Sequence, residues 1–245
     1  MNDVMAVALQ AMQSDASRLA RVGTNLANAM TPGYKREVAI QHTNDGGGAS
    51  FASLVDAQAA ALPSGVPASS DVQRDMRVGT LKITGQPLDF ALTGPGFFEL
   101  STPSGPAYTR HGQFHVDARG RVVTAQGHAV MGSGGEIILT GTPSVDATGS
   151  FKENGRVVAK LRVVDFDHAG RLDRIDAGYA GSERTNVVDE ALVQVRQGHL
   201  ENANVDTAHE MIDLIKTMRH FESMQRAVQS YDDMVGMGIR KLGES

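Results

Sequence analysis

The chain has 245 residues, a formal net charge of −5, and neither Cys nor Trp. The lack of cysteine excludes disulfides, zinc–thiolate sites, iron–sulfur clusters and thiol nucleophiles. A mildly acidic chain with 5% aromatic residues is poorly equipped to follow a phosphate backbone or stack on bases, so no nucleic-acid partner is expected. No segment approaches the ~18 consecutive apolar residues of a membrane span, and Asp3 stands where a signal peptide carries positive charge.

Residues 3–29 contain no proline and have the pattern of one amphipathic helix. Apolar side chains recur at every seventh position, at Met5, Met12, Leu19 and Leu26. The triplet Thr31, Pro32 and Gly33 then ends the helix, because Pro disfavours helical geometry in the residue before it and Gly permits a sharp exit.

The middle of the chain changes character twice. Residues 41–74 are dominated by Gly, Ala, Ser, Asp and Gln, a composition that indicates a linker. From about 75 to 198, short strand-like runs alternate with turn residues, which predicts an all-β domain. The predicted strands are residues 88–92, 97–100, 113–116, 121–124, 136–139 and 157–166, with hairpin turns at 117–120 and 167–170.

A second, longer helix is predicted at the other end. Thr207 and Glu210 have the spacing of a capping box, so the helix should begin there. Its apolar residues again recur every seven positions, at Leu214, Phe221, Val228, Val235 and Leu242, with Met211 and Met218 beside them. A helix of roughly 36 residues is longer than most globular helices, and the sustained heptad favours a coiled-coil partner.

These patterns predict an α+β fold in which N- and C-terminal helices form a coiled-coil layer around a central all-β domain. The expected domains are 1–40 (N-terminal helix), 41–74 (linker), 75–198 (β domain) and 199–245 (C-terminal helix). Amphipathic helices often pack on their own domain, but two heptad helices at opposite ends must pair with each other or with neighbouring subunits. The predicted assembly residues are Met12, Leu19, Leu26, Met211, Leu214, Met218, Phe221, Val228 and Val235.

An alternative of another class is a secreted calcium-binding β protein or an enzyme. Five residues match positions 1, 3, 6, 9 and 12 of a calcium-binding loop, namely Asp165, Asp167, Gly170, Asp173 and Asp176. Position 5 is Ala169, position 12 is Asp where the loop uses Glu, and the flanks have the pattern of strands. We therefore favour a solvated turn and expect no catalytic residues, metal, cofactor or small-molecule substrate.

Three stretches resemble the flagellar rod and hook-basal body protein family. They are TNLANAMTPGYKR (residues 24–36), PLDFALTGPGFFEL with YTRHGQFHVDARGRVVTAQGHAVMG (87–100 and 108–132), and GHLENANVDTAHEMIDLIKTMRHFE (198–222). The resemblance assigns a signature turn to Asn25, Asn28, Thr31, Pro32 and Gly33. Ala203 departs from the pattern, since the family usually has Ser there. The short linker and the run 219–222 are more similar to the proximal rod proteins than to the distal rod or hook-type proteins.

The resemblance implies a non-enzymatic subunit of the bacterial flagellar basal-body rod in the periplasm. Such a subunit assembles helically through its terminal helices and transmits torque. Its implied partners are other copies of itself, other flagellar rod proteins and the flagellar export apparatus. The chain would leave the cell unfolded by flagellar type III export, without a cleaved signal peptide.

Overall fold

The computed structural model describes residues 2–40, 71–167, 169, 172–175, 178–180, 186–188 and 193–243. The fold is α+β, with one helix near each end and a β-rich middle, as predicted. The chain divides into two compact units. The helical unit comprises Met1–Thr24, Glu37–Gln73 and Ala208–Ser245, and the β unit comprises Asn25–Arg36 and Arg74–Thr207. Residues 41–70 of the predicted linker lie outside the described residues, and its last four residues, 71–74, form a strand.

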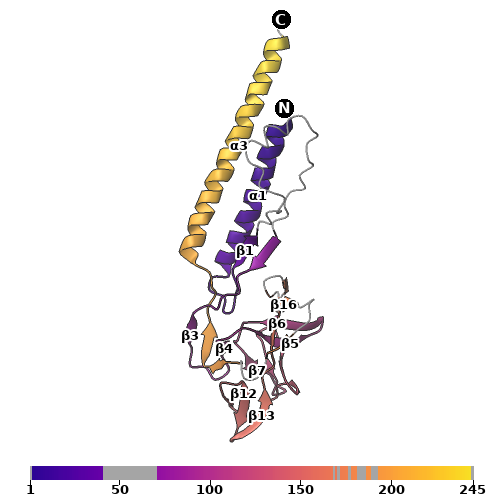
Figure 1. Cartoon of the computed structure of the whole chain (residues 1–245), viewed down its shortest axis with the longest axis vertical. Helices are drawn as coiled ribbons and strands as arrows, with labels where there is room; N and C mark the ends of the chain where they lie inside the picture. Colours follow the sequence, from indigo (N-terminus) through magenta and orange to yellow (C-terminus); the bar gives the residue numbers. More distant parts are fainter. Residues whose placement is uncertain are drawn as a thin grey trace. The chain divides into compact units, whose positions relative to one another are not determined.

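The helical unit contains the two helices that the heptad patterns predict. Helix α1 is Asn2–Ala27, and helix α3 is Thr207–Gly243, 37 residues that begin at the predicted cap. The helices run alongside each other, and α3 continues past the start of α1 (Figure 1). The early part of α1 meets the late part of α3, since Met5 and Ala8 line one crevice with Val228 and Tyr231. The pair is therefore antiparallel. Strands β1 (Glu37–Ile40) and β2 (Asp71–Arg74) form a two-stranded sheet.

The β unit is built around one large sheet. Its main path follows the order β15-β16-β6-β5-β9-β8-β7, with β10, β14 and β17 attached at its sides. These strands are β5 (Phe97–Thr102), β6 (Gly105–Thr109), β7 (His115–Val116), β8 (Val122–Val123), β9 (Ala129–Gly132), β10 (Gly135–Glu136), β14 (Val163–Asp165), β15 (Asp173–Ile175), β16 (Gly178–Ala180) and β17 (Asn186–Val187). The predicted turn at 117–120 joins β7 to β8, where Gly120 has φ +80°.

Three smaller sheets complete the β unit. A three-stranded antiparallel sheet contains β11 (Ser144–Val145), β12 (Ser150–Glu153) and β13 (Arg156–Lys160). Two pairs join strands far apart in the chain, β4 (Phe90–Leu92) with β18 (Val195–Gln197) and β3 (Leu81–Ile83) with β19 (His199–Glu201). The second pair places residues 199–201, which follow the expected boundary at 198/199, in the sheets of the β unit.

Strand β5 lies between two apolar clusters, because successive side chains of a strand point to opposite faces. Phe98 and Leu100 belong to the larger cluster, where the Phe98 and Phe114 rings pack edge to face at 5.4 Å between centroids. Phe97 belongs to the smaller cluster, which contains Phe166. Both faces of β5 are covered, which explains why apolar residues occupy adjacent positions at its start, Phe97 and Phe98. The aromatic residues of the chain are thus concentrated in the core of the β unit.

Candidate functional site

The contacts between α1 and α3 define which face of each helix is covered within one chain. Asp15 Oδ2 lies 2.5 Å from Nδ1 of His220, and Arg18 Nη2 lies 3.4 Å from Oδ1 of Asp213. His209 on α3 lies 3.8 Å from the other oxygen of Asp213, so this carboxylate has basic groups on both helices. These polar contacts join the two helices in the same antiparallel register as the apolar crevice at Met5 and Val228.

Part of the predicted assembly row lies on this covered face, where Val228 lines a crevice with Met5 and Ala8 of α1. With a rotation of about 100° per residue, Leu214, Phe221 and Val228 lie roughly 60–100° around α3 from Asp213. They are accordingly half-buried. On α1, the predicted residues Met12, Leu19 and Leu26 are also half-buried. One chain therefore covers this row only in part, and nothing is described for the side chain of Val235.

A second apolar face on α3 lies away from α1. Met211, Ile215 and Met218 are about 140–180° around the helix from Asp213 and His220. They are 52%, 50% and 48% exposed, and their neighbour Ile212 is 50% exposed. We call Met211, Ile212, Ile215 and Met218 the exposed stripe. The heptad analysis found Met211 and Met218 but missed the two isoleucines, although a spacing of i, i+4 and i+7 from 211 was available to find Ile215.

The predicted signature turn is held by hydrogen bonds within the β unit. The hydroxyl of Tyr34 donates to Oδ1 of Asn25 over 2.9 Å. Oδ1 of Asn28 accepts from the Thr31 hydroxyl at 3.4 Å and from Arg174 at 3.3 Å. The two asparagines are thus the acceptors that shape the turn.

Gly33 is required at the centre of this turn. Its φ is +70°, a conformation that other residues avoid, and its N–H donates to the carbonyl of Glu201 over 2.7 Å. A Cβ at this position would lie 2.4 Å from the carbonyl carbon of Arg110. The Thr-Pro-Gly sequence therefore ends the helix and also brings the backbone close to two other parts of the chain.

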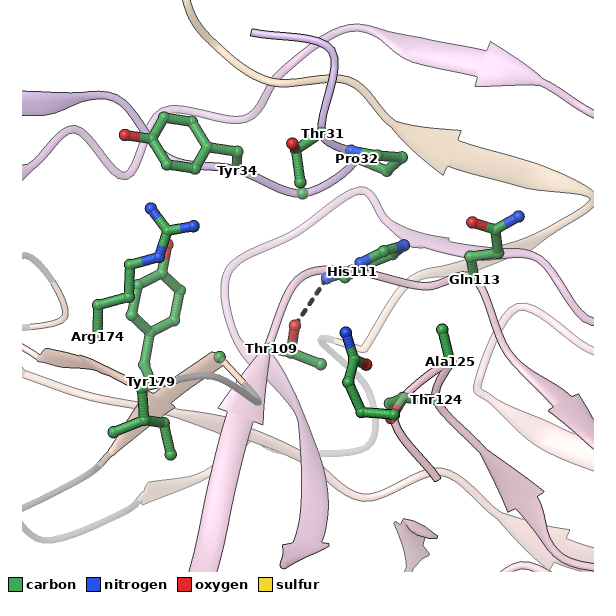
Figure 2. A pocket seen from close by; sticks show the side chains of 14 residues that line it. Thr31, Pro32, Tyr34, Thr109, His111, Gln113, Thr124, Ala125, Arg174 and Tyr179 are labelled. Atoms are coloured by element: carbon green, nitrogen blue, oxygen red, sulfur yellow. Dashed lines mark hydrogen bonds between the residues drawn. The ribbon is translucent and has the colours of Figure 1, made fainter. Parts of the chain in front are cut away.

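A cavity of about 230 Å³ lies between the turn and the β sheet. Figure 2 shows Tyr34 on the turn near Arg174 and Tyr179, and His111, whose backbone N–H donates to the Thr109 hydroxyl over 3.0 Å. The Arg174 guanidinium lies 5.0 Å from the centre of the Tyr34 ring, and burial lowers the pKa of His111. The volume is below the ~300–1,000 Å³ usual for small-molecule sites. We therefore treat the cavity as part of the packing of the turn.

Three buried charged side chains, those of Lys35, Arg110 and Glu201, lie close to the same turn. Lys35 Nζ lies 2.7 Å from Oε1 of Glu201, and Arg110 Nη1 lies 3.4 Å from Oε2. The side chains of Lys35 and Glu201 are both 1% exposed. Burial lowers the pKa of Lys35 and of Arg110, and the Glu201 carboxylate partly opposes the shift in each case. The sequence analysis missed this cluster, because its members are separated by up to 166 residues.

The calcium-loop alternative gains no support from the residues that are described. Gly170 and Asp176 lie outside them, and Oδ1 of Asp167 accepts a hydrogen bond from the Asn186 amide at 3.0 Å. The described part of the chain contains no group of three or more His, Asp or Glu side chains placed to hold a metal ion. Neither described helix has a segment long and apolar enough to cross a membrane.

Comparison with known proteins places these features in one family. Residues 91–159 match the family described as flagellar hook protein FlgE/F/G D1 domain, and residues 196–240 match flagellar basal body rod FlgEFG protein C-terminal. The flagellar basal-body rod protein FlgF of Mesorhizobium japonicum is 30% identical over 249 residues, covering 99% of each chain. FlgF of Rhizobium meliloti is 31% identical, covering 98% of this chain and 97% of the relative. FlgG of Bacillus subtilis is 26% identical, covering 93% and 94%.

The chain therefore belongs to the flagellar basal-body rod protein family. This confirms the resemblance drawn from the three signature stretches, including the likeness to proximal rod proteins. The homologues are structural rod proteins and not enzymes, so the enzyme alternative is wrong.

Proposed function

We propose that this chain is a structural subunit of the flagellar basal-body rod, in which it assembles with copies of itself and with other rod proteins. Membership of the rod family supports the location in the basal body. The observation that carries the assembly role is the exposed stripe, since α1 covers only one side of α3. Apolar side chains that are half exposed along about two turns of one helix are typical of an interaction surface.

In this proposal α1 and α3 join a coiled-coil layer made by several subunits, and the β unit lies outside that layer. Helices α1 (Asn2–Ala27) and α3 (Thr207–Gly243) supply this layer, and the residues from Arg74 to Thr207 supply most of the β unit. Burial of the exposed stripe against a neighbouring helix would contribute roughly 1.5–3 kcal/mol for each fully covered Leu-sized side chain. A helical assembly uses heterologous contacts, so the half-buried row of Leu214, Phe221 and Val228 meets one neighbour and the exposed stripe another.

Torque passes through such seams when the side chains of adjacent subunits interlock, as knobs do in the holes of a coiled coil. Delivery by the flagellar export apparatus without signal cleavage fits this role, because helices with incompletely covered apolar faces gain their full packing only after assembly. A distal rod or hook-type position is the alternative within the family. The chain is 30% and 31% identical to the two FlgF relatives and 26% identical to the FlgG relative.

Charge introduced into the exposed stripe tests the assembly role. Ile215→Asp is expected to abolish rod assembly and swimming while leaving the thermal melt of the purified chain within a few degrees of the parent. The matched control is Ile138→Asp in the β unit, because Ile138 is 57% exposed and Ile215 is 50% exposed. The control should assemble and swim. Normal swimming by cells that carry only the Ile215→Asp chain would contradict the proposal.

A further inference from the structure

The cluster of Lys35, Arg110 and Glu201 joins segments that are distant in the sequence. Lys35 follows the signature turn, Arg110 follows β6, and Glu201 ends β19. Each residue comes from a different one of the three stretches on which the family resemblance rests. In the folded chain, one residue from each stretch therefore contributes to the same buried ionic cluster.

Glu201 is the shared member of the cluster. Its Oε1 accepts from Lys35 Nζ at 2.7 Å and from the backbone N–H of Gly79 at 2.9 Å, and its Oε2 faces Arg110 Nη1 at 3.4 Å. Lys35 also donates to the carbonyl of Arg77 over 2.8 Å, and Arg110 donates to that of Gly94 over 2.8 Å. One carboxylate near the C-terminal end thus contacts Lys35 near the N-terminal end and Gly79 and Arg110 in the middle of the chain.

The charge balance makes this carboxylate indispensable. Two cations and one anion are buried together, so the cluster carries one excess positive charge, which Asp75 near Lys35 and Asp165 near Arg110 offset in part. Taking charges out of water is costly, and the cost is recovered only when they are paired at close range. Without the Glu201 charge, two cations would remain buried close to one another.

We propose that Glu201 is a positioning residue that makes the docking of the signature turn and the docking of strand β19 on the β unit depend on each other. In the sequence, the turn follows the end of α1 at Ala27, and β19 precedes the start of α3 at Thr207. The consequence for assembly rests on the proposed function. The mutual dependence is a property of the single chain.

Hydrogen exchange in the full-length chain tests the dependence through named amides. On the N-terminal side, the N–H of Tyr34 bonds to the carbonyl of Thr31 at 3.2 Å. On the C-terminal side, the N–H of Asn202 bonds to the carbonyl of Thr80 at 2.8 Å. Phe98, which is fully buried on β5, is the reference for the core.

Glu201→Gln removes the charge and keeps the shape of the side chain. The Tyr34 and Asn202 amides should then exchange faster together, by on the order of a hundredfold, because a buried charge is left uncompensated. The Phe98 amide should be unchanged. The matched control is Glu136→Gln, which removes an exposed ion pair with Arg121 at 3.5 Å and should change none of the three amides. Faster exchange on one side alone, equal acceleration of Phe98, or no change at all would overturn the proposal.

Lys35→Met is the second variant, and it decides the question if Glu201→Gln does not fold. It leaves Glu201 paired with Arg110, so the expected acceleration is smaller, about tenfold, but it must reach Asn202 as well as Tyr34. Acceleration confined to Tyr34 would refute mutual dependence. The rod role is tested by a separate experiment, the swimming of cells that carry Ile215→Asp. Normal swimming by those cells would contradict the rod role, whatever exchange pattern the Glu201 and Lys35 variants show.

Discussion

The two units of this chain cover their apolar side chains to very different degrees. In the β unit, Phe90, Phe98 and Phe151 are fully buried and belong to the same apolar cluster. In the helical unit, the apolar side chains of α3 that the structure describes are half-buried at best, and those of the exposed stripe are about half exposed. The difference indicates that the β unit is complete within one chain, whereas the helices have surface left for other chains.

The largest expected effect is the loss of a core ring in the β unit. Phe98→Ala removes a fully buried side chain next to Phe114 and should lower the free energy of unfolding by about 3–5 kcal/mol. Phe221→Ala on α3 should cost clearly less in the single chain, because this side chain is only half-buried. Denaturant unfolding of both variants measures the contrast. Equal losses would mean that the two units are packed alike.

The next largest effect is expected when glycine is replaced by alanine in the signature turn, compared with the same replacement in an ordinary turn. Gly33 and Gly85 both have φ +70°, but a Cβ meets Arg110 backbone atoms at Gly33 and open space at Gly85. Gly85→Ala should cost only the backbone strain, roughly 1–3 kcal/mol, and Gly33→Ala should cost more because of the added clash. Chemical denaturation gives both values. A cost at Gly85 that equals or exceeds the cost at Gly33 is the result that would count against the close approach.

The two helices, the end of α1 and the β-rich middle of the chain could be predicted from sequence, because each depends on local signals. The period of seven placed α1 and α3, the Thr207 and Glu210 pair placed the start of α3, and Thr31, Pro32 and Gly33 placed the end of α1. The pairing of β3 with β19 could not be predicted, since no local pattern specifies which strands meet. For the same physical reason, the contact between Lys35 and Glu201 emerged only from the folded chain.

A smaller effect concerns the carboxylates of the β unit at low pH. Hydrogen bonds from Thr148 and other neighbours hold the pKa of Asp146 well below its usual range, and hydrogen bonds with Arg77 and Arg121 lower those of Asp75 and Asp117. Each group binds its proton less tightly when folded, so its contribution is present above the unfolded pKa of about 4 and is lost as pH falls through the folded pKa.

The melting temperature of the chain should therefore fall below about pH 4. The lowered pKa of His111 adds a fall between pH 7 and 5, because the imidazole binds its proton more tightly in the unfolded chain. Asp146→Asn should make the acid-side fall shallower, because this group no longer titrates. Melting curves between pH 2 and 7 measure both slopes. An Asp146→Asn variant with the parent's full acid slope would contradict the assignment.

The smallest effect is expected for the ion pair between the helices. The Arg18 side chain is 48% exposed, and its contact with Asp213 is 3.4 Å long. Arg18→Ala should change stability by about 0.2–1 kcal/mol, and salt should reduce even this difference. Unfolding at low and at high salt measures it. A salt-independent loss of several kcal/mol would show that α1 and α3 form a tightly closed pair in one chain.

Hydrogen exchange of the same chain, first as a monomer and then in assembled rods, tests the central claim most directly. We expect the α3 amides near Ile215 to exchange much faster than those of β5 in the monomer, and to slow markedly in the rod while β5 changes little. The account is contradicted if α3 is already as protected as β5 in the monomer, or if assembly leaves its exchange unchanged.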